Sequence, residues 1–97
     1  MQRTFDFYSD SGHGWLKVPK GLLSHFSITE KISSFSYQRG NFAYLEEDCD
    51  ATTFCNAYES RNGCTPKFRF HNTDGRSKIR SYESYRPVVK VLDFRGK

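Results

Sequence analysis

The amino-acid sequence predicts an α+β fold, in which an antiparallel sheet of about five strands carries two helices on one face. Three observations predict it: short stretches in which apolar and polar residues alternate, two stretches with helical spacing, and glycine-containing turns between them. The chain has 97 residues and no internal repeat, and this length fits one domain. We therefore treat residues 1–97 as a single domain, and we expect residues 86–97 to form a loosely ordered tail or an edge strand.

The first quarter of the chain predicts two strands followed by a short helix. Phenylalanines alternate with polar residues over residues 3–8, as they do in a half-buried strand. Glycines and small polar residues at 9–14 favour a turn, and residues 15–18 follow as a second short strand. Pro19 suits the first turn of a helix that ends near Ser27. Three apolar residues then share one side of this helix: Leu22, Leu23 and Phe26.

A β-hairpin is predicted in the middle of the chain, with strands at residues 32–37 and 42–47. Aromatic residues alternate with serine in the first strand and with small or aliphatic residues in the second. Gly40, within the four residues that join them, permits a tight turn.

The clearest helix follows this hairpin. Its apolar residues recur at i, i+3, i+4 and i+7, and they are Ala51, Phe54, Cys55 and Tyr58. Asp48 or Asp50 can cap its N-terminus, and the Asn62–Gly63 pair favours a left-handed stop. We therefore predict a helix that begins near residue 50 and ends near residue 62.

The last third of the chain has a less regular pattern. Residues 67–71 alternate basic with aromatic side chains, which predicts a strand with one buried and one wet face. Residues 72–75 resemble a turn. From 76 to 86 the periodicity fails, so we expect a surface loop there, and residues 88–94 could form a last strand.

Charge is unevenly distributed along the chain. The whole sequence has a net charge of +4, from 15 Lys and Arg against 11 Asp and Glu. Residues 1–66 hold six basic and eight acidic residues, a net of −2, whereas residues 67–97 hold nine basic and three acidic residues, a net of +6. The two parts of the chain therefore point to different partners.

Acidic residues crowd the junction between the second hairpin strand and the following helix. Carboxylates at a helix N-terminus favour the helix dipole and cap free N–H groups, which is one explanation of the cluster. Four acids within five positions repel one another, however, and a basic partner would neutralise them. A calcium site is disfavoured, because the rest of an EF-hand loop is missing. The candidate partner-binding residues are Glu46, Glu47, Asp48, Asp50 and, two turns further along the helix, Glu59.

The basic C-terminal third supports the opposite inference. Cations hold phosphates and rings stack on bases in nucleic-acid interfaces, and here both residue types are interleaved. The same alternation is equally expected of a strand whose phenylalanines are core and whose cations are solvated. The candidate nucleic-acid-binding residues are Arg69, Arg76, Lys78, Arg80 and Arg86, with Phe68, Phe70, Tyr82 and Tyr85 as the accompanying rings.

The sequence lacks the motifs of an enzyme. Serine, aspartate and histidine occur together in the turn at 9–14, but neighbours in one turn cannot adopt the spatial roles of a catalytic triad. Three cysteines and His71 could supply zinc ligands, yet their spacings match no common zinc finger, so we interpret Cys49, Cys55 and Cys64 as reduced thiols. We expect a protein without catalytic residues, metal or cofactor.

Three segments are similar to parts of small proteins encoded by phages, prophages and plasmids. They are residues 11–18 (SGHGWLKV), 31–37 (KISSFSY) and 43–50 (AYLEEDCD). The kind of protein that the chain resembles is an anti-CRISPR inhibitor. Such inhibitors share no signature, so no site residue is transferred from them. The resemblance implies a compact, non-enzymatic protein that binds a CRISPR–Cas effector complex and blocks recognition of target DNA, in some cases by imitating DNA.

The leading hypothesis is therefore an inhibitor that places the acidic cluster in a basic nucleic-acid cleft of its partner. Its sequence pI of 9.1 differs from that of strongly acidic DNA mimics, which limits any mimicry to a local patch. The alternative is a small nucleic-acid-binding protein that uses the basic third. We expect a cytoplasmic location in the host bacterial cell, no membrane association, and a monomer or small homodimer.

Overall fold

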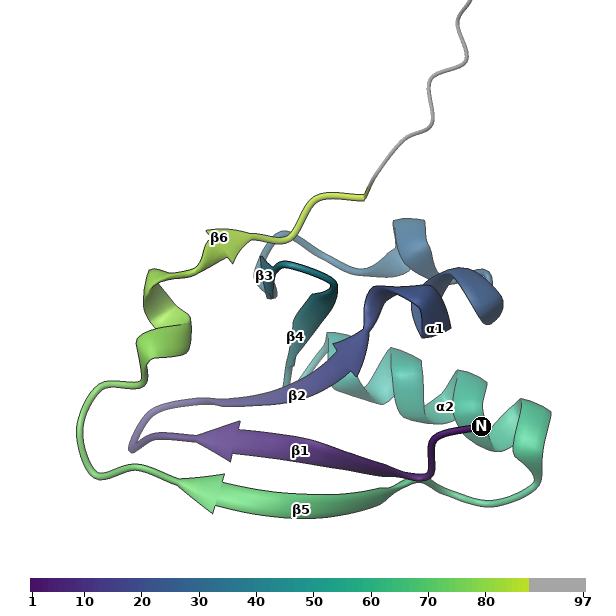
Figure 1. The fold of residues 1–97 in the computed structure, drawn as a ribbon, viewed down its shortest axis with the longest axis horizontal. Coiled ribbons are helices and arrows are strands. Elements are labelled where there is room, and N and C mark those ends of the chain that lie inside the picture. The colour runs from purple at the N-terminus through teal and green to yellow at the C-terminus, as the bar shows by residue number, and fades with distance from the viewer. Residues whose placement is uncertain (88–97) are drawn as a thin grey trace, which may run out of the picture.

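The computed structural model describes residues 1–87 (Figure 1). The strand expected at residues 88–94, and most of the tail expected at 86–97, lie outside the described residues. Within the described part, six strands form one sheet in the order β5-β1-β2-β4-β3-β6. The strands are β1 (Thr4–Ser9), β2 (Gly14–Pro19), β3 (Tyr37–Arg39), β4 (Phe42–Glu46), β5 (Lys67–Asn72) and β6 (Glu83–Ser84).

The sheet is mixed, so the expectation of a purely antiparallel sheet of about five strands is wrong in its pairing. β1 and β5 run parallel, and every other neighbouring pair is antiparallel. The connectivity explains this exception. β4 and β1 are both antiparallel to β2, so they run in the same direction. After β4, the helix carries the chain across the sheet, and β5 then pairs with β1 and runs in that same direction.

Two helices lie on one face of the sheet, as predicted. α1 (Lys20–His25) follows β2, and α2 (Asp50–Asn62) follows β4. Phe26, just after α1, and Phe54 of α2 have ring centroids 5.8 Å apart, so both helices share one core. The sheet contributes Phe5, whose ring meets that of Phe54 edge-on at 5.2 Å. The other buried sheet residues of this core are Leu16, Val18, Ala43 and Leu45.

The ends of α2 agree only in part with expectation. Gly63 has φ of 75° and ends the helix in the left-handed conformation, as the sequence predicted. At the N-terminus, Cys49 occupies the capping position and its side chain accepts no hydrogen bond from the first N–H groups of the helix, so neither Asp48 nor Asp50 caps the helix. Asp50 is the first helical residue, and its carboxylate accepts hydrogen bonds from Ser33 and Ser36 outside the helix.

The hairpin is shorter than predicted. Only Tyr37–Arg39 pairs with β4, through the tight turn at Gly40, where φ is 59°. Residues before Tyr37 form a turn, in which the Ser36 N–H donates to the Ser33 carbonyl, and a short 3₁₀ helix, η1 (Thr29–Lys31), precedes it. The serine alternation that predicted a strand instead supplies hydroxyls to a buried carboxylate.

A second, smaller apolar cluster lies on the opposite face of the sheet. Trp15 of β2 and Tyr44 of β4 point to this face and are covered by Ile79. Ile79 belongs to the 3₁₀ helix η2 (Lys78–Ser81), within the segment that was expected to be a surface loop. That expectation is wrong, because Ser77, Ile79 and Tyr85 are all buried.

The remaining composition-based expectations concern thiols, metals and membranes. Cys49, Cys55 and Cys64 are free thiols. Residues 1–87 contain no group of three or more His, Cys, Asp or Glu side chains that could hold a metal ion. No helix among these residues is long and apolar enough to cross a membrane.

Candidate nucleic-acid interface

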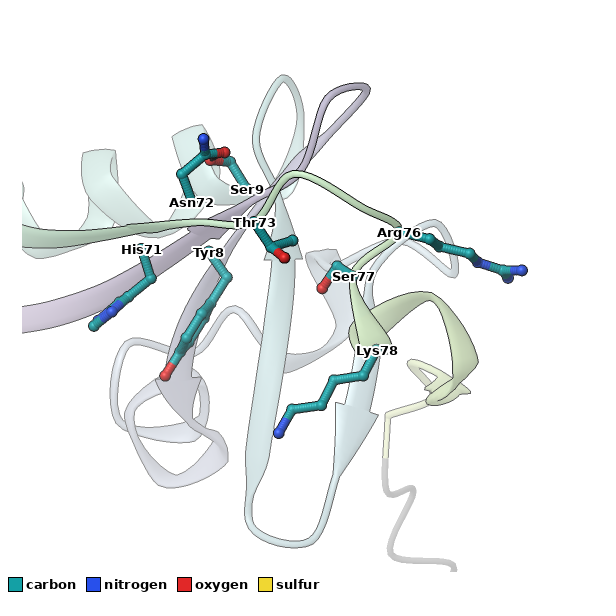
Figure 2. Close-up of a pocket in the computed structure, with 8 residues that line it drawn as sticks. All are labelled: Tyr8, Ser9, His71, Asn72, Thr73, Arg76, Ser77 and Lys78. Atoms are coloured by element: carbon teal, nitrogen blue, oxygen red, sulfur yellow. Dashed lines mark hydrogen bonds between the residues drawn. The ribbon is translucent and has the colours of Figure 1, made fainter.

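A groove of about 340 Å³ opens on the face of the sheet opposite α2. One wall is formed by β1 and β5, and the other by the segment that leads into η2 (Figure 2). Its lining residues are Tyr8, Ser9, His71, Asn72, Thr73, Arg76, Ser77 and Lys78. The groove therefore combines aromatic rings, hydroxyls, an amide and cations, and no carboxylate lines it.

The first wall carries a stacked pair of rings. The parallel register places Tyr8 of β1 directly opposite His71 of β5. Their ring centroids are 4.8 Å apart and the planes are inclined by only 19°. Desolvation raises the pKa of the Tyr8 hydroxyl, and the nearby Asp6 carboxylate adds to this effect. Tyr8 therefore stays a neutral phenol at physiological pH and offers a hydrogen-bonding hydroxyl, while its ring stacks on His71 and packs against the cluster around Trp15.

A single carboxylate orders the cations of this wall. Asp6 Oδ1 accepts a hydrogen bond of 2.8 Å from Arg69 Nε and lies 2.9 Å from His71 Nε2. The hydrogen bond from Arg69, followed by that from His71, lowers the pKa of Asp6. Asp6 holds both side chains on the groove side of β5, while the guanidinium of Arg69 remains largely exposed to solvent.

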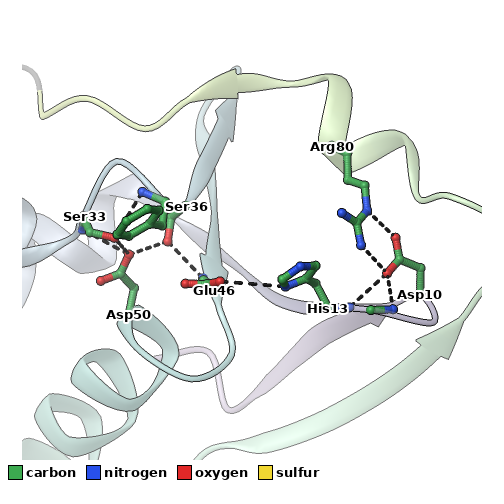
Figure 3. A network of polar contacts seen from close by, with 9 residues as sticks. Asp10, His13, Ser33, Ser36, Glu46, Asp50 and Arg80 are labelled. Carbon is green, nitrogen blue, oxygen red and sulfur yellow. Dashed lines mark hydrogen bonds and ion pairs between the residues drawn. The ribbon is translucent and has the colours of Figure 1, made fainter.

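The second wall is fixed to the sheet by the buried carboxylate of Asp10. Its Oδ1 accepts from the Gly12 and His13 N–H groups at 3.0 Å, and its Oδ2 accepts from the Ser77 N–H at 3.0 Å. Arg80 completes the contact with Nε 2.7 Å from Oδ2 and Nη2 2.9 Å from Oδ1 (Figure 3). These donors, with Arg80 the strongest, hold the pKa of Asp10 far below its usual range.

The Asp10 contacts position the chain that carries Lys78. Lys78 is exposed on η2, one residue beyond the anchored Ser77. Figure 2 shows its side chain extending in the same general direction as those of Tyr8 and His71, whereas Arg76 points away from them. Lys78 therefore faces the space beside the ring pair, and Arg76 lies at its outer end.

The five basic residues predicted from the sequence have three different fates. The structure brings Lys78 into the groove, places Arg76 at its outer end with its side chain pointing away, and places Arg69 next to it. Arg80 is committed to Asp10 and lies over the Trp15 ring, with its guanidinium carbon 5.5 Å from the ring centroid. Arg86 is paired with Glu83 beside β6, at the other edge of the sheet.

None of the rings that accompany these cations in the sequence lines the groove. Strand alternation directs Phe68 and Phe70 to the α2 side, away from Arg69 and His71. Tyr85 is buried and donates a hydrogen bond to the Thr29 carbonyl. Tyr82 packs against Tyr44 at 5.0 Å and belongs to the small cluster around Trp15.

The acidic cluster is divided by the fold. Asp50 is only 1% exposed and accepts hydrogen bonds from the Ser33 N–H, the Ser33 hydroxyl and the Ser36 hydroxyl. Its carboxylate ties α2 to the turn before β3 (Figure 3). Asp50 is therefore not available to a partner at the surface, which corrects its place among the predicted partner-binding residues.

The other acidic residues remain at the surface to different degrees. Glu46 is half-buried, with Oε2 3.9 Å from His13 Nδ1. Glu47 and Asp48 are exposed at the start of α2, and Glu59 is exposed near the end of that helix. The exposed part of the predicted patch is thus centred on Glu47 and Asp48.

The residues that sequence reasoning missed are Tyr8, Ser9, Asn72, Thr73 and Ser77. Tyr8 was assigned to the polar side of its strand, and His71 was considered only as a zinc ligand and as part of the basic alternation. Their pairing depends on the parallel alignment of β1 with β5, which are separated by more than half of the chain. No local pattern encodes that alignment.

Comparison with protein-family models, curated protein sequences and solved structures gave no match for this chain. The function is therefore inferred from the groove and the surface alone.

Proposed function

We propose that this protein binds single-stranded nucleic acid in the groove between β5, β1 and η2. The observation that carries the proposal is the Tyr8–His71 ring pair, flanked by the cations Arg69, Lys78 and Arg76 and ordered by Asp6. Aromatic faces that accept a base and cations that accept its phosphates are the two requirements for single-strand binding. The proposed role is binding, without a chemical step.

The shape of the site favours a single strand over a duplex. In a duplex the base faces are stacked on one another and cannot reach a protein ring. The groove is open and of a size to receive about one nucleotide, with its base against the Tyr8–His71 ring pair and its phosphate near Lys78. The hydroxyls of Thr73 and Ser77 line the same groove and can meet base edges or sugar hydroxyls, whereas the side chains of Ser9 and Asn72 point to the other side of the strands (Figure 2).

Fluorescence anisotropy with a labelled oligo(dT) of about 12 nucleotides tests this proposal. We expect binding by the full chain at about 50 mM NaCl that weakens at least several-fold at about 200 mM, because the release of counterions from the phosphates favours binding less as the salt concentration rises. A duplex of the same length should bind more weakly. Equal affinity for the two forms would argue against base stacking.

Two substitutions and their matched controls locate the binding site. Tyr8→Ala should weaken binding by roughly 5- to 100-fold, the usual range for loss of one stacked base, whereas Phe35→Ala should not. Phe35 is 72% exposed and lies outside the groove, so it controls for loss of a surface ring. Lys78→Glu should weaken binding and flatten its salt dependence, whereas Lys31→Glu should do neither. Unchanged binding in both groove variants would refute the site.

A second candidate function rests on the exposed carboxylates of Glu47 and Asp48. These side chains could dock in the nucleic-acid cleft of a CRISPR–Cas effector complex, which is the function implied by the resemblance to anti-CRISPR inhibitors. Added protein should then block target DNA binding by the effector, and Glu47→Lys with Asp48→Lys should restore it. If added protein does not reduce target DNA binding by the CRISPR–Cas effectors of its host cell, this candidate is excluded.

A further inference from the structure

The outer edge of β5 is unpaired among the described residues. β5 is the terminal strand of the sheet, and all six of its residues are exposed (Figure 1). An open edge of this length presents N–H and C=O groups that can pair with another strand. Natural edge strands are usually shortened, bulged, covered or charged; β5 is neither shortened nor bulged along its six-residue pairing with β1, and it carries the charged residues Lys67 and Arg69.

The hydrogen bonds to β1 identify which amides face outward. The Lys67 N–H donates to the Arg3 carbonyl, and the Thr73 N–H donates to the Ser9 carbonyl. Alternate residues of a strand direct their N–H groups to opposite edges, so residues 67, 69, 71 and 73 bond inward. The N–H groups of Phe68, Phe70 and Asn72 therefore point to solvent at the free edge.

An apolar groove of about 310 Å³ runs along this edge on the α2 side. Phe7, Phe68 and Phe70 form a ring cluster, with centroids 5.6 Å to 6.4 Å apart. Leu16, Ala51 and Cys55 form its floor. Phe68 is nevertheless 38% exposed and Phe70 72% exposed, so α2 leaves these rings partly uncovered. The edge thus offers apolar binding area as well as backbone groups.

The opposite side of the same strand is basic. Lys67, Arg69 and His71 alternate with the phenylalanines and face the other side of the sheet. A second copy of β5 pairing antiparallel to the first would bring the Lys67 and Arg69 cations of the two copies close together, which costs free energy. A strand with acidic residues on that side would instead meet opposite charges.

We propose that the β5 edge binds an extended segment of a partner protein in which apolar residues alternate with Asp or Glu. The segment adds a seventh strand to the sheet. Its backbone pairs with the N–H and C=O groups of Phe68, Phe70 and Asn72, its apolar side chains cover the phenylalanine groove, and its carboxylates face Lys67, Arg69 and His71. The phenylalanine groove lies on the other side of the sheet from the nucleic-acid groove, whereas His71 and Arg69 border both sites.

Amide hydrogen exchange on the full chain, followed by NMR, tests the proposal. The probe is an N-acetylated, C-amidated peptide of about seven residues in which Val and Glu alternate. We expect saturating peptide to slow exchange at the amides of Phe68, Phe70 and Asn72 at least about tenfold, while exchange at Lys67, Arg69 and His71 changes little. Unchanged exchange at the three outward amides would overturn strand addition.

Matched controls separate backbone pairing, apolar contact and charge. A Val–Lys peptide should bind at least about tenfold more weakly, and so should the Val–Glu peptide with N-methylated valines, which cannot pair fully. Phe70→Ser should lose a similar amount, whereas Phe35→Ser, which removes an equally exposed ring elsewhere, should lose none. Equal affinity for the acidic and basic peptides would contradict the proposed partner chemistry.

The free chain also reports on other occupants of the edge. Protection of Phe68, Phe70 and Asn72 that rises with protein concentration would assign the edge to a second copy of the chain. Protection that is present without peptide and independent of concentration would assign it to the same chain. Either result would contradict the proposal, and neither would alter the nucleic-acid test, which measures Tyr8 and Lys78.

Discussion

Asp10 and Asp50 hold together segments that are far apart in the sequence. Asp10 joins the β1–β2 turn to the segment before η2, and Asp50 joins α2 to the turn before β3. In both cases several donors surround one carboxylate, which compensates the cost of burying it. Neither role was predictable, because a buried acceptor surrounded by serine or backbone donors has the same sequence appearance as a surface acid.

Replacing Asp10 should lower the stability of the fold and make that stability less sensitive to acidic pH. Because the folded pKa of Asp10 lies below the usual aspartate value of 3.8, its carboxylate stabilises the fold above that pH and loses this contribution as the pH falls through the acidic range. Asp10→Asn should lower Tm at neutral pH by at least about 5 °C and flatten the fall in Tm between about pH 4 and about pH 2. Thermal unfolding followed by circular dichroism measures both effects.

The exposed Asp74 supplies the control for Asp10. Asp74→Asn should leave Tm and its pH profile close to those of the unmodified chain. An Asp10→Asn protein that loses as much stability between neutral and acidic pH as the parent would show that the Arg80 contact contributes little.

Asp50→Ala should destabilise the chain by about 3 kcal/mol, since it leaves two hydroxyls and one N–H without their acceptor. Urea unfolding measures this change. The adjacent Asp48→Ala, which removes an exposed acid, should change the free energy of unfolding by less than about 0.5 kcal/mol. Comparable losses in the two variants would mean that Asp50 acts as a surface charge, as the sequence first suggested.

Local elements were predictable where the pattern was self-contained. The strands at β1 and β2, the short helix after Pro19, and α2 with its stop at Gly63 all follow from spacing and turn chemistry. The parallel pairing of β5 with β1 and the packing of η2 on Trp15 did not follow. Both join residues more than 60 positions apart, and periodicity specifies only which face a residue takes, never which strand lies beside it.

The element that closes the groove depends on Ile79. Ile79→Ala should remove the contact of η2 with Trp15 and Tyr44, destabilise the fold by about 2 to 4 kcal/mol, and shift tryptophan emission to longer wavelength as water reaches the indole. Binding of oligo(dT) should weaken as well, because Lys78 is no longer held in place. Intrinsic fluorescence and anisotropy measure these effects under folding conditions.

Ile32→Ala is the matched control for Ile79. Ile32 is equally buried but belongs to the core on the α2 face. This variant should lose similar stability while the folded protein keeps its tryptophan emission and its affinity for oligo(dT). Parallel losses of affinity in the two variants would indicate a general effect of stability and not a role for η2.

Across the whole molecule, the basic and acidic residues that are separated along the sequence also lie on different surfaces. The C-terminal basic residues were predictable as a group, but the fold assigns them separate tasks: Arg80 fixes a segment, Arg86 pairs near β6, and Lys78 lines the groove. The acidic residues were also divided, with Asp50 enclosed and Glu47 exposed. Composition indicated that two kinds of surface exist, and only the tertiary structure shows which side chains reach them.

The proposed function is tested most directly by an amide NMR titration of the full chain with unlabelled oligo(dT). We predict that the largest shift changes fall at residues 8–9, 71–73 and 76–78, around the ring pair and Lys78, and that they diminish as salt is raised. Changes confined to residues 46–48, or no change at protein and oligonucleotide concentrations in the high micromolar range, would contradict the assignment of the groove as the nucleic-acid site.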